Sequence, residues 1–281
     1  MAVLPTPTLD HVVVNVRDQI EAAFATYRRL GFTLTPRGYH TLGSMNHLAV
    51  FGTDYLEIIA APANESRRAD ILQAPAGLNG LVFGTEDTAS VYQAIRGVGV
   101  AAEPPDEFSR PVEVPGGERR DAVFRTVRLT QQQIPGSRLY FCQHLTRDLV
   151  WRDVWRRHPN GVIGIVRAVI AADTPQEIGD LFARMFGHQA VRRAANSCTL
   201  LVGLSTFEIV TRDALARTFG PAAPDHLDGV SFMAALTLRT RSLQQAGAVL
   251  SAAGVKHLTS DRGTLVVAAQ DAFGVTLEFC A

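Results

Sequence analysis

LDHVVVNV (residues 9–16) is the stretch that decides the fold, because the pattern it begins recurs four times in the 281-residue chain. This apolar strand is followed by a helical pattern over residues 18–30, which ends at Gly31, and then by short strands that close with YLEIIA (55–60). Three later copies begin with GLNGLVFGT (77–85), GVIGIVRAVI (161–170) and VSFMAALTL (230–238). They close with RLYFCQH (138–144), TFEIV (206–210) and VTLEF (275–279). Such repetition indicates four copies of one strand–helix–three-strand module.

A single module of this kind buries too little apolar surface to be stable alone. Two modules side by side can form one curved sheet, with helices outside and a cavity inside. The sequence therefore predicts an α+β fold, in which four βαβββ modules pair into two open barrel-like domains. The first domain is expected at residues 1–147 and the second at 160–281, with a linker at 148–159. The Pro- and Gly-rich segment 104–121 is expected to be a surface loop, and one interpretation makes it a lid over the cavity.

The composition excludes several classes of protein. Lys and Arg together number 27, as do Asp and Glu, and this balance argues against a nucleic-acid partner. No apolar run approaches the roughly 18 residues of a transmembrane helix, and the start MAVLPTPT lacks the features of a signal peptide. Three widely spaced cysteines without a CxxC motif favour reduced thiols. We therefore expect a cytoplasmic protein that acts on a small-molecule substrate and binds neither nucleic acid nor membrane. Its oligomeric state stays open, with a homodimer among the options.

Strand alternation predicts which side chains meet in the first cavity. In the opening strand the valines at 12, 14 and 16 share one face, which suits packing on the helix, and His11 shares the other face with Asn15. In the closing strand Tyr55 and Glu57 share a face. If the apolar faces go to the helix, His11 and Glu57 both face the cavity.

Five segments carry a family resemblance: LDHVVVNVRD (9–18), LGF (30–32), HTLGSMNHLAVFGTDYLEII (40–59), FCQHLTRDLVWR (141–152) and QDAFGVTLEF (270–279). They resemble the glyoxalase-like branch of the vicinal oxygen chelate superfamily. The resemblance covers nearly the whole chain, and it implies paired βαβββ modules that form an open barrel with a divalent metal inside. Lyases, isomerases, epimerases, extradiol-type dioxygenases and drug-sequestering proteins share this fold, so the resemblance does not choose the reaction.

The resemblance also implies that metal ligands come from the opening and closing strands, where His11 and Glu57 match the ligand positions. An imidazole nitrogen and a carboxylate suit Zn, Fe, Mn or Ni, and a third ligand is needed to hold such an ion. The second module offers Asn79 or Gly80 in its opening strand, and His144 in its closing strand is the preferred third ligand. His40 and His47, from the first module, are alternatives.

Two functions follow as hypotheses. The first is a metal-dependent lyase, isomerase or dioxygenase that acts on a small substrate with vicinal oxygens. There His11, Glu57 and His144 would hold the metal, and Glu57 could instead serve as a catalytic base. Pocket-lining roles are expected for Asn15, Tyr55 and Tyr140. The alternative is a metal-free protein of the same fold that binds or sequesters a small molecule.

The second half of the chain lacks the His–Glu pair. Alignment of Gly187 with Gly31 places Arg167 where the first module has His11, and Glu208 is retained. An ion pair between Arg167 and Glu208 would take the place of a metal. The second domain is therefore predicted to be structural, or to be a metal-free binding pocket.

Overall fold

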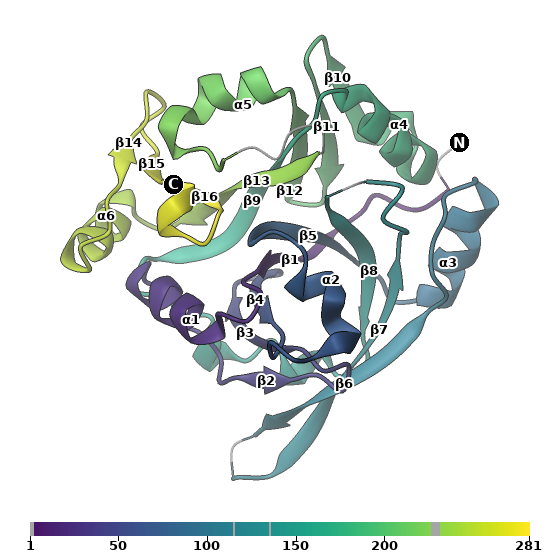
Figure 1. The fold of residues 1–281 in the computed structure, drawn as a ribbon, viewed down its shortest axis with the longest axis horizontal. Coiled ribbons are helices and arrows are strands. Elements are labelled where there is room, and N and C mark those ends of the chain that lie inside the picture. Colours follow the sequence, from purple (N-terminus) through teal and green to yellow (C-terminus); the bar gives the residue numbers. More distant parts are fainter. Residues whose placement is uncertain (1–2, 115, 135, 226–230) are drawn as a thin grey trace.

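The computed structural model of the chain describes residues 3–114, 116–134, 136–225 and 231–281, and it contains two eight-stranded sheets (Figure 1). The first sheet has the order β2-β3-β4-β1-β5-β8-β7-β6. Its strands are β1 (Leu9–Asn15), β2 (Gly38–Tyr39), β3 (Met45–Val50), β4 (Tyr55–Ala60), β5 (Gly77–Gly84), β6 (Asp106–Glu113), β7 (Arg119–Arg128) and β8 (Arg138–His144).

The second sheet repeats this order as β10-β11-β12-β9-β13-β16-β15-β14. Its strands are β9 (Val162–Ala171), β10 (Val191–Ala194), β11 (Ser197–Val202), β12 (Ser205–Val210), β13 (Phe232–Thr240), β14 (Leu258–Thr259), β15 (Leu265–Val267) and β16 (Thr276–Cys280). The predicted α+β fold of paired βαβββ modules is confirmed. The domain boundaries proposed from the sequence remain a prediction.

Each module contributes one helix between its first and second strands. These helices are α1 (Ile20–Arg29), α3 (Thr88–Gly97), α4 (Pro175–Phe186) and α6 (Leu243–Ala252). Two more, α2 (Ala69–Leu72) and α5 (Arg212–Phe219), follow the closing strands of the first and third modules. Within the described residues, no helix is both long and apolar enough to cross a membrane.

The two modules of each half join through their opening strands. β1 runs parallel to β4 and antiparallel to β5, and β9 is placed in the same way between β12 and β13. At the outer edges of the first sheet, the Thr41 amide donates a hydrogen bond to the Ser109 carbonyl at 2.9 Å. This contact brings the β2 and β6 edges together, so that the first sheet curls into a nearly closed barrel (Figure 1).

One expectation about the first half was wrong. The segment 104–121 is not a surface loop, because most of it forms the antiparallel β6–β7 hairpin, paired from Asp106–Thr126 to Glu113–Arg119. Its prolines mislead a reading of the sequence. Pro111 lies in β6, an edge strand, where a residue without an N–H costs no ladder hydrogen bond. The hairpin is therefore part of the cavity wall.

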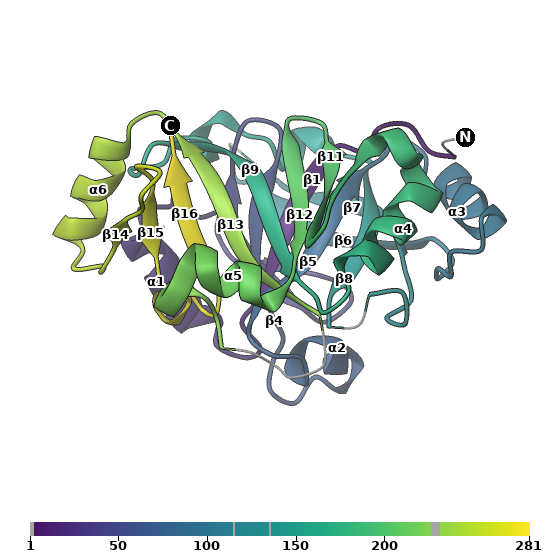
Figure 2. The same ribbon diagram turned by 90° about the horizontal axis from the view of Figure 1, so that it is seen from above.

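The two halves share one apolar core. Helix α1 lies near α6 at one end of the molecule and α3 near α4 at the other, with the sheets between them (Figures 1 and 2). Phe83 of β5 lies with its ring centroid 5.0 Å from Phe186 of α4 and 5.5 Å from Phe207 of β12. The valines at 12, 14 and 16 belong to this core, as their spacing predicts, which leaves the other face of β1 for the cavity.

Candidate active site

The first barrel encloses a buried cavity whose free space is about 40 Å³. Strands β1, β3, β4, β6, β7 and β8 all contribute to its wall, together with the loop between β2 and β3. Its polar lining comprises His11, His40, Ser44, Asn46, Tyr55, Glu57, Arg68, Arg110, Thr126, Arg128, Arg138, Tyr140 and Cys142. The apolar lining includes Phe108 and Phe124, whose rings stack at 5.3 Å.

His11 and Glu57 are brought together by the register of β1 and β4. His11 lies opposite Tyr55 and Val13 opposite Glu57, so alternation points His11, Tyr55 and Glu57 into the cavity. The His11 Nε2 atom lies 3.7 Å from a Glu57 carboxylate oxygen, and both side chains are buried. Two metal-ligand types therefore share one small, enclosed space.

Three neighbours fix the His11 imidazole in place. Its Nδ1 lies 2.6 Å from the Asp10 carboxylate, its Nε2 lies 3.1 Å from the Tyr140 hydroxyl, and the Tyr55 ring stacks on it at 4.4 Å. Burial opposes charge on Asp10, but the neighbouring His144 and the hydrogen bonds from His11 and His144 lower its pKa overall. Since an ionised carboxylate only accepts hydrogen bonds, Nδ1 donates to Asp10, so in the neutral imidazole the lone pair is on Nε2, which faces the cavity.

Glu57 is held in its ionised form. Burial alone would raise its pKa, but His11, His40, a hydrogen bond from Asn46 at 2.6 Å and Arg138 together lower it. Burial lowers the pKa of His40 to about 4, opposed by Glu57 and helped by Arg110 and Arg68. His40 is therefore neutral at physiological pH, and its Nε2 lies 4.0 Å from Glu57.

The second module places a glycine and a tyrosine where the first has its His–Glu pair. Val13 lies opposite Glu57 between β1 and β4, and in the same way Val82 lies opposite Tyr140 between β5 and β8. Gly80, two residues before Val82, corresponds to His11. Burial raises the pKa of the Tyr140 hydroxyl far above its ordinary value, so this group is a neutral hydrogen-bond donor.

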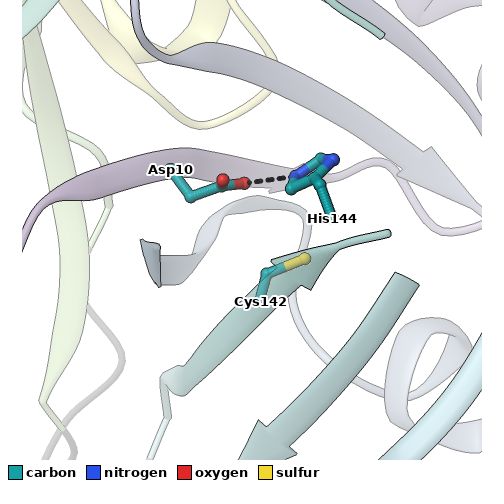
Figure 3. Close-up of side chains that lie close together, drawn as sticks. All are labelled: Asp10, Cys142 and His144. Atoms are coloured by element: carbon teal, nitrogen blue, oxygen red, sulfur yellow. Dashed lines mark hydrogen bonds and ion pairs between the residues drawn. The ribbon is translucent and has the colours of Figure 1, made fainter. Parts of the chain in front are cut away.

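His144 lies on the other side of His11 from Glu57. Its Nε2 is 3.0 Å from the same Asp10 oxygen that binds His11, so Asp10 separates the two imidazoles. With Asp10 and Cys142, His144 forms the one group in the described part of the chain with three or more His, Cys, Asp or Glu ligand atoms all within 4.8 Å (Figure 3). The structure therefore brings His11 to Glu57, but it brings His144 to Asp10 and Cys142.

A second cavity, of about 890 Å³, lies on the side where His144 is found. Asp10, Cys142 and His144 form part of its wall, and residues 202–205 of the second half form another part. Cys142 lines both cavities. The Asp10–Cys142–His144 cluster therefore stands between the buried cavity and a larger one formed by both halves of the chain.

Of the other residues named from the sequence, Tyr55 and Tyr140 line the buried cavity and Asn15 does not. The Asn15 amide donates to the carbonyls of Ile71 and Pro75 at 2.9 and 3.2 Å, so it holds the α2 segment in place. His47 is hydrogen-bonded to the Thr35 carbonyl at 2.8 Å and does not line the cavity either.

Asp10 was missed from the sequence, although it stands directly before His11. The pairing of β1 with β5 shifts by one residue between Leu9 and His11. Strict alternation would put Asp10 on the face opposite His11, and this irregularity instead allows both side chains to meet. The signal available in the sequence was the adjacent Asp–His pair itself.

In the second half, Arg167 occupies the position of His11 and pairs with two carboxylates. Its guanidinium binds Glu208 at 2.8 Å and Glu278 at 2.7 Å, and its Nε donates to Thr237 at 3.0 Å. The predicted ion pair with Glu208 is confirmed, and Glu278 is a further partner. A fixed positive charge therefore lies between the glutamates of the second sheet.

Comparison with known proteins identifies the family. A family model described as "Glyoxalase-like domain" matches residues 9–186, which is more than half of the chain. The chain therefore belongs to the glyoxalase-like domain family, and its resemblance to the vicinal oxygen chelate superfamily is confirmed. No match was found among curated proteins.

Several solved structures share the fold over almost the whole chain. A hypothetical protein from Staphylococcus aureus is 12% identical, with a TM-score of 0.68 and coverage of 98% of this chain and 99% of that one. A variant of 4-hydroxymandelate synthase from Streptomyces coelicolor is 13% identical (TM-score 0.59; 98% and 92% covered). The 2,3-dioxygenase LapB from Pseudomonas sp. KL28 is 14% identical (TM-score 0.57; 98% and 91% covered). At these identities the likeness concerns the fold alone.

Proposed function

We propose that this chain is an enzyme that holds a divalent metal between His11 and Glu57 and acts on a small substrate with neighbouring oxygens. The observation that supports it most is the contact chain from Asp10 through His11 to Glu57. Histidines that ligate metals usually donate their other ring N–H to a carboxylate, and Asp10 takes that hydrogen bond here at 2.6 Å. The names of two structural neighbours, a 2,3-dioxygenase and 4-hydroxymandelate synthase, are compatible with such chemistry.

The residues present fit a metal in three respects. His11 Nε2 faces Glu57 rather than the Asp10 carboxylate, Glu57 is ionised, and both side chains are buried. Nitrogen and carboxylate donors suit Zn, Fe, Mn or Ni. Of the groups beside this pair, the Tyr140 hydroxyl lies closest to Nε2, at 3.1 Å, and the neutral His40 lies 4.0 Å from Glu57. A bound divalent metal would supply Lewis-acid activation of a substrate oxygen.

The side chains themselves supply the proton chemistry. Asp10 keeps the Nδ1 proton of His11 in place, so the imidazole presents its Nε2 lone pair to the cavity. Where Glu57 does not ligate the metal, its ionised carboxylate, hydrogen-bonded through one oxygen to Asn46, can instead accept a proton from a substrate carbon or hydroxyl on its other oxygen. The neutral Tyr140 hydroxyl can donate a hydrogen bond to a substrate oxygen that becomes negative. Lyase, isomerase and dioxygenase reactions could each use these groups.

One observation favours the alternative, a metal-free binding protein. The Tyr140 hydroxyl already lies within hydrogen-bond distance of His11 Nε2, where a ligand bond to a metal would form. In that case the cavity would hold a small molecule through hydrogen bonds alone, and metal supplementation would change neither stability nor ligand binding.

Elemental analysis separates the two functions. The protein would be purified without a metal-affinity tag, supplemented with Zn, Fe, Mn or Ni, dialysed and analysed for metal. We expect about one equivalent of metal in the wild type, because a folded site of this kind should retain it. His11→Ala and Glu57→Gln should each lose it. The matched controls His188→Ala and Glu103→Gln change exposed residues and should retain it.

The same measurement distinguishes the two places where ligands gather. If His144→Ala and Cys142→Ser abolish binding while His11→Ala and Glu57→Gln do not, the metal belongs to the Asp10–Cys142–His144 cluster, and the proposed site is wrong. If the supplemented wild type holds no metal, the metal-free function stands instead.

A further inference from the structure

Arg110 is a buried cation with no hydrogen-bond or ion-pair partner among the residues that the structure describes. It lies in β6 with 4% of its surface exposed and lines the buried cavity. Its Nε is fully buried and unpaired, and its guanidinium forms no hydrogen bond or ion pair with any residue that the structure describes. A buried charge without a counter-charge is costly, so proteins normally pair such groups.

The other three arginines in the wall do have partners. Arg68 and Arg138 share Asp70, at 2.9 and 3.2 Å, and Arg128 lies 3.7 Å from Asp106. The remaining carboxylate of the cavity, Glu57, faces His11 and His40. Four arginines therefore stand against three carboxylates, Asp70, Asp106 and Glu57, and Glu57 acts on Arg110 only through its charge, without a hydrogen bond or ion pair.

The fold makes room for this unpaired side chain. A Cβ atom at Gly38 would lie 2.5 Å from a terminal nitrogen of Arg110 and 2.9 Å from its Cδ, so glycine at position 38 leaves space for the Arg110 side chain where it lies. Arg110 also lines an outer cleft of about 350 Å³, which is separate from the cavity beside His144. The wall of this outer cleft includes Arg37, Arg119 and Arg152. The guanidinium thus stands between the buried cavity and this cleft. Glu113 also lines the cleft and Arg37 pairs with Glu21, so the remaining excess of arginine favours anions there.

We propose that Arg110 binds the oxyanion, carboxylate or phosphate, of a compact substrate held in the cavity. A planar guanidinium with free N–H donors matches either group by paired charge-assisted hydrogen bonds. The free space of about 40 Å³ has room for about three water molecules, so the ligand is small unless the wall moves. This inference rests on the proposed function in that it uses the same cavity, but the oxyanion contact does not depend on the metal.

Calorimetric titration of the metal-free, EDTA-dialysed protein tests this inference. The probes are glycolate, its neutral analogue glycolamide, and inorganic phosphate, and melting temperatures are recorded alongside. We expect the wild type to bind one of the two anions about 10-fold or more tighter than glycolamide. Arg110→Met should lose that preference. It should also melt no lower than the wild type without ligand, because it removes an unpaired buried charge. Arg110→Lys should keep part of the preference.

The matched control is Arg125→Met, which removes a partly exposed arginine of β7 that pairs with Glu107 outside the cavity. It should bind the anions as the wild type does. A preference for glycolate identifies a carboxylate and a preference for phosphate identifies a phosphate, and either supports the inference. Equal anion binding by Arg110→Met and wild type, or no anion binding by the wild type, would overturn it. If the protein holds no metal but still binds the anion in an Arg110-dependent way, the metal proposal is wrong and the inference about Arg110 stands.

Discussion

Asp54 is a carboxylate buried where the two halves of the molecule meet. One of its oxygens accepts a hydrogen bond from the Ile165 amide at 3.0 Å, across the boundary between the two sheets. Burial raises its pKa from the ordinary 3.8 to about 7, although the hydrogen bonds from Ile165 and Thr53 oppose this shift. The charged form is therefore disfavoured in the folded chain.

This shift gives a pH-dependent stability whose sign can be stated. The unfolded chain loses the Asp54 proton near its ordinary pKa, whereas the folded chain keeps it to about pH 7. The contribution of Asp54 to stability is thus fully present below about pH 4 and is lost as pH rises to about 7. Asp54→Asn, which keeps the acceptor for Ile165, should be more stable than the wild type near pH 8.5, by up to about 4 kcal/mol.

Urea unfolding near pH 5 and near pH 8.5 measures this effect, with the exposed Asp18→Asn as the control. The stability difference between Asp54→Asn and wild type should grow toward the higher pH. A difference that is the same at both pH values would show that Asp54 is ionised throughout.

At the level of single residues, part of the site was predictable from the sequence. The shared cavity of His11 and Glu57 follows from strand alternation, because each lies inside a regular, strongly patterned strand. The role of Asn15 as a link to α2 could not be predicted, since it depends on carbonyls about sixty residues away. Arg110 was hidden by the interpretation of its segment as a loop, and its lack of a partner is visible only once the surrounding charges are placed.

Among the elements, the junction of β1 and β5 is tightly packed near the site. Gly80 of β5 lies opposite Val13, and a Cβ at position 80 would lie 2.8 Å from the Val13 Cβ. That atom is fixed to the neighbouring strand and cannot move away as the end of a long side chain could. Glycine at this position therefore permits the close approach of the two strands that aligns the modules.

Gly80→Ala should destabilise the protein by about 1–3 kcal/mol, because the added methyl group forces β1 and β5 apart. Gly97→Ala is the control, since nothing lies within 4 Å of a Cβ there and the residue ends helix α3. It should be neutral or stabilising by up to about 1 kcal/mol. Chemical denaturation of both variants measures the difference, and equal stability would mean that the strands tolerate a wider spacing.

The helices and opening strands were predictable because their apolar periodicity and terminal glycines are local signals. The β6–β7 hairpin was not, since its prolines and glycines are also typical of loops. Its β6 segment forms a strand because it lies at the edge of the first sheet and contacts the β2 edge through the hydrogen bond from the Thr41 amide to the Ser109 carbonyl. Such tertiary context overrides local propensity.

Over the whole molecule, four similar modules have unequal interiors. The first barrel has a histidine and a glutamate at corresponding positions of β1 and β4, and the second has Arg167 with Glu208 and Glu278. A guanidinium bound to both Glu208 and Glu278 places a positive charge beside the glutamates of the second half that correspond to Glu57. The repeat was predictable from sequence, as was the Arg167–Glu208 pair, because both follow from the alignment of modules.

The central claim is that a metal binds to His11 and Glu57, with only nitrogen and oxygen ligands. Zinc K-edge X-ray absorption of the wild type, loaded with one equivalent of zinc, tests it most directly because it reports ligand type. We expect a shell of nitrogen and oxygen at about 2.0–2.2 Å and no sulfur. A sulfur shell at about 2.3 Å would show a cysteine ligand, as the Asp10–Cys142–His144 cluster would supply, and would contradict the account.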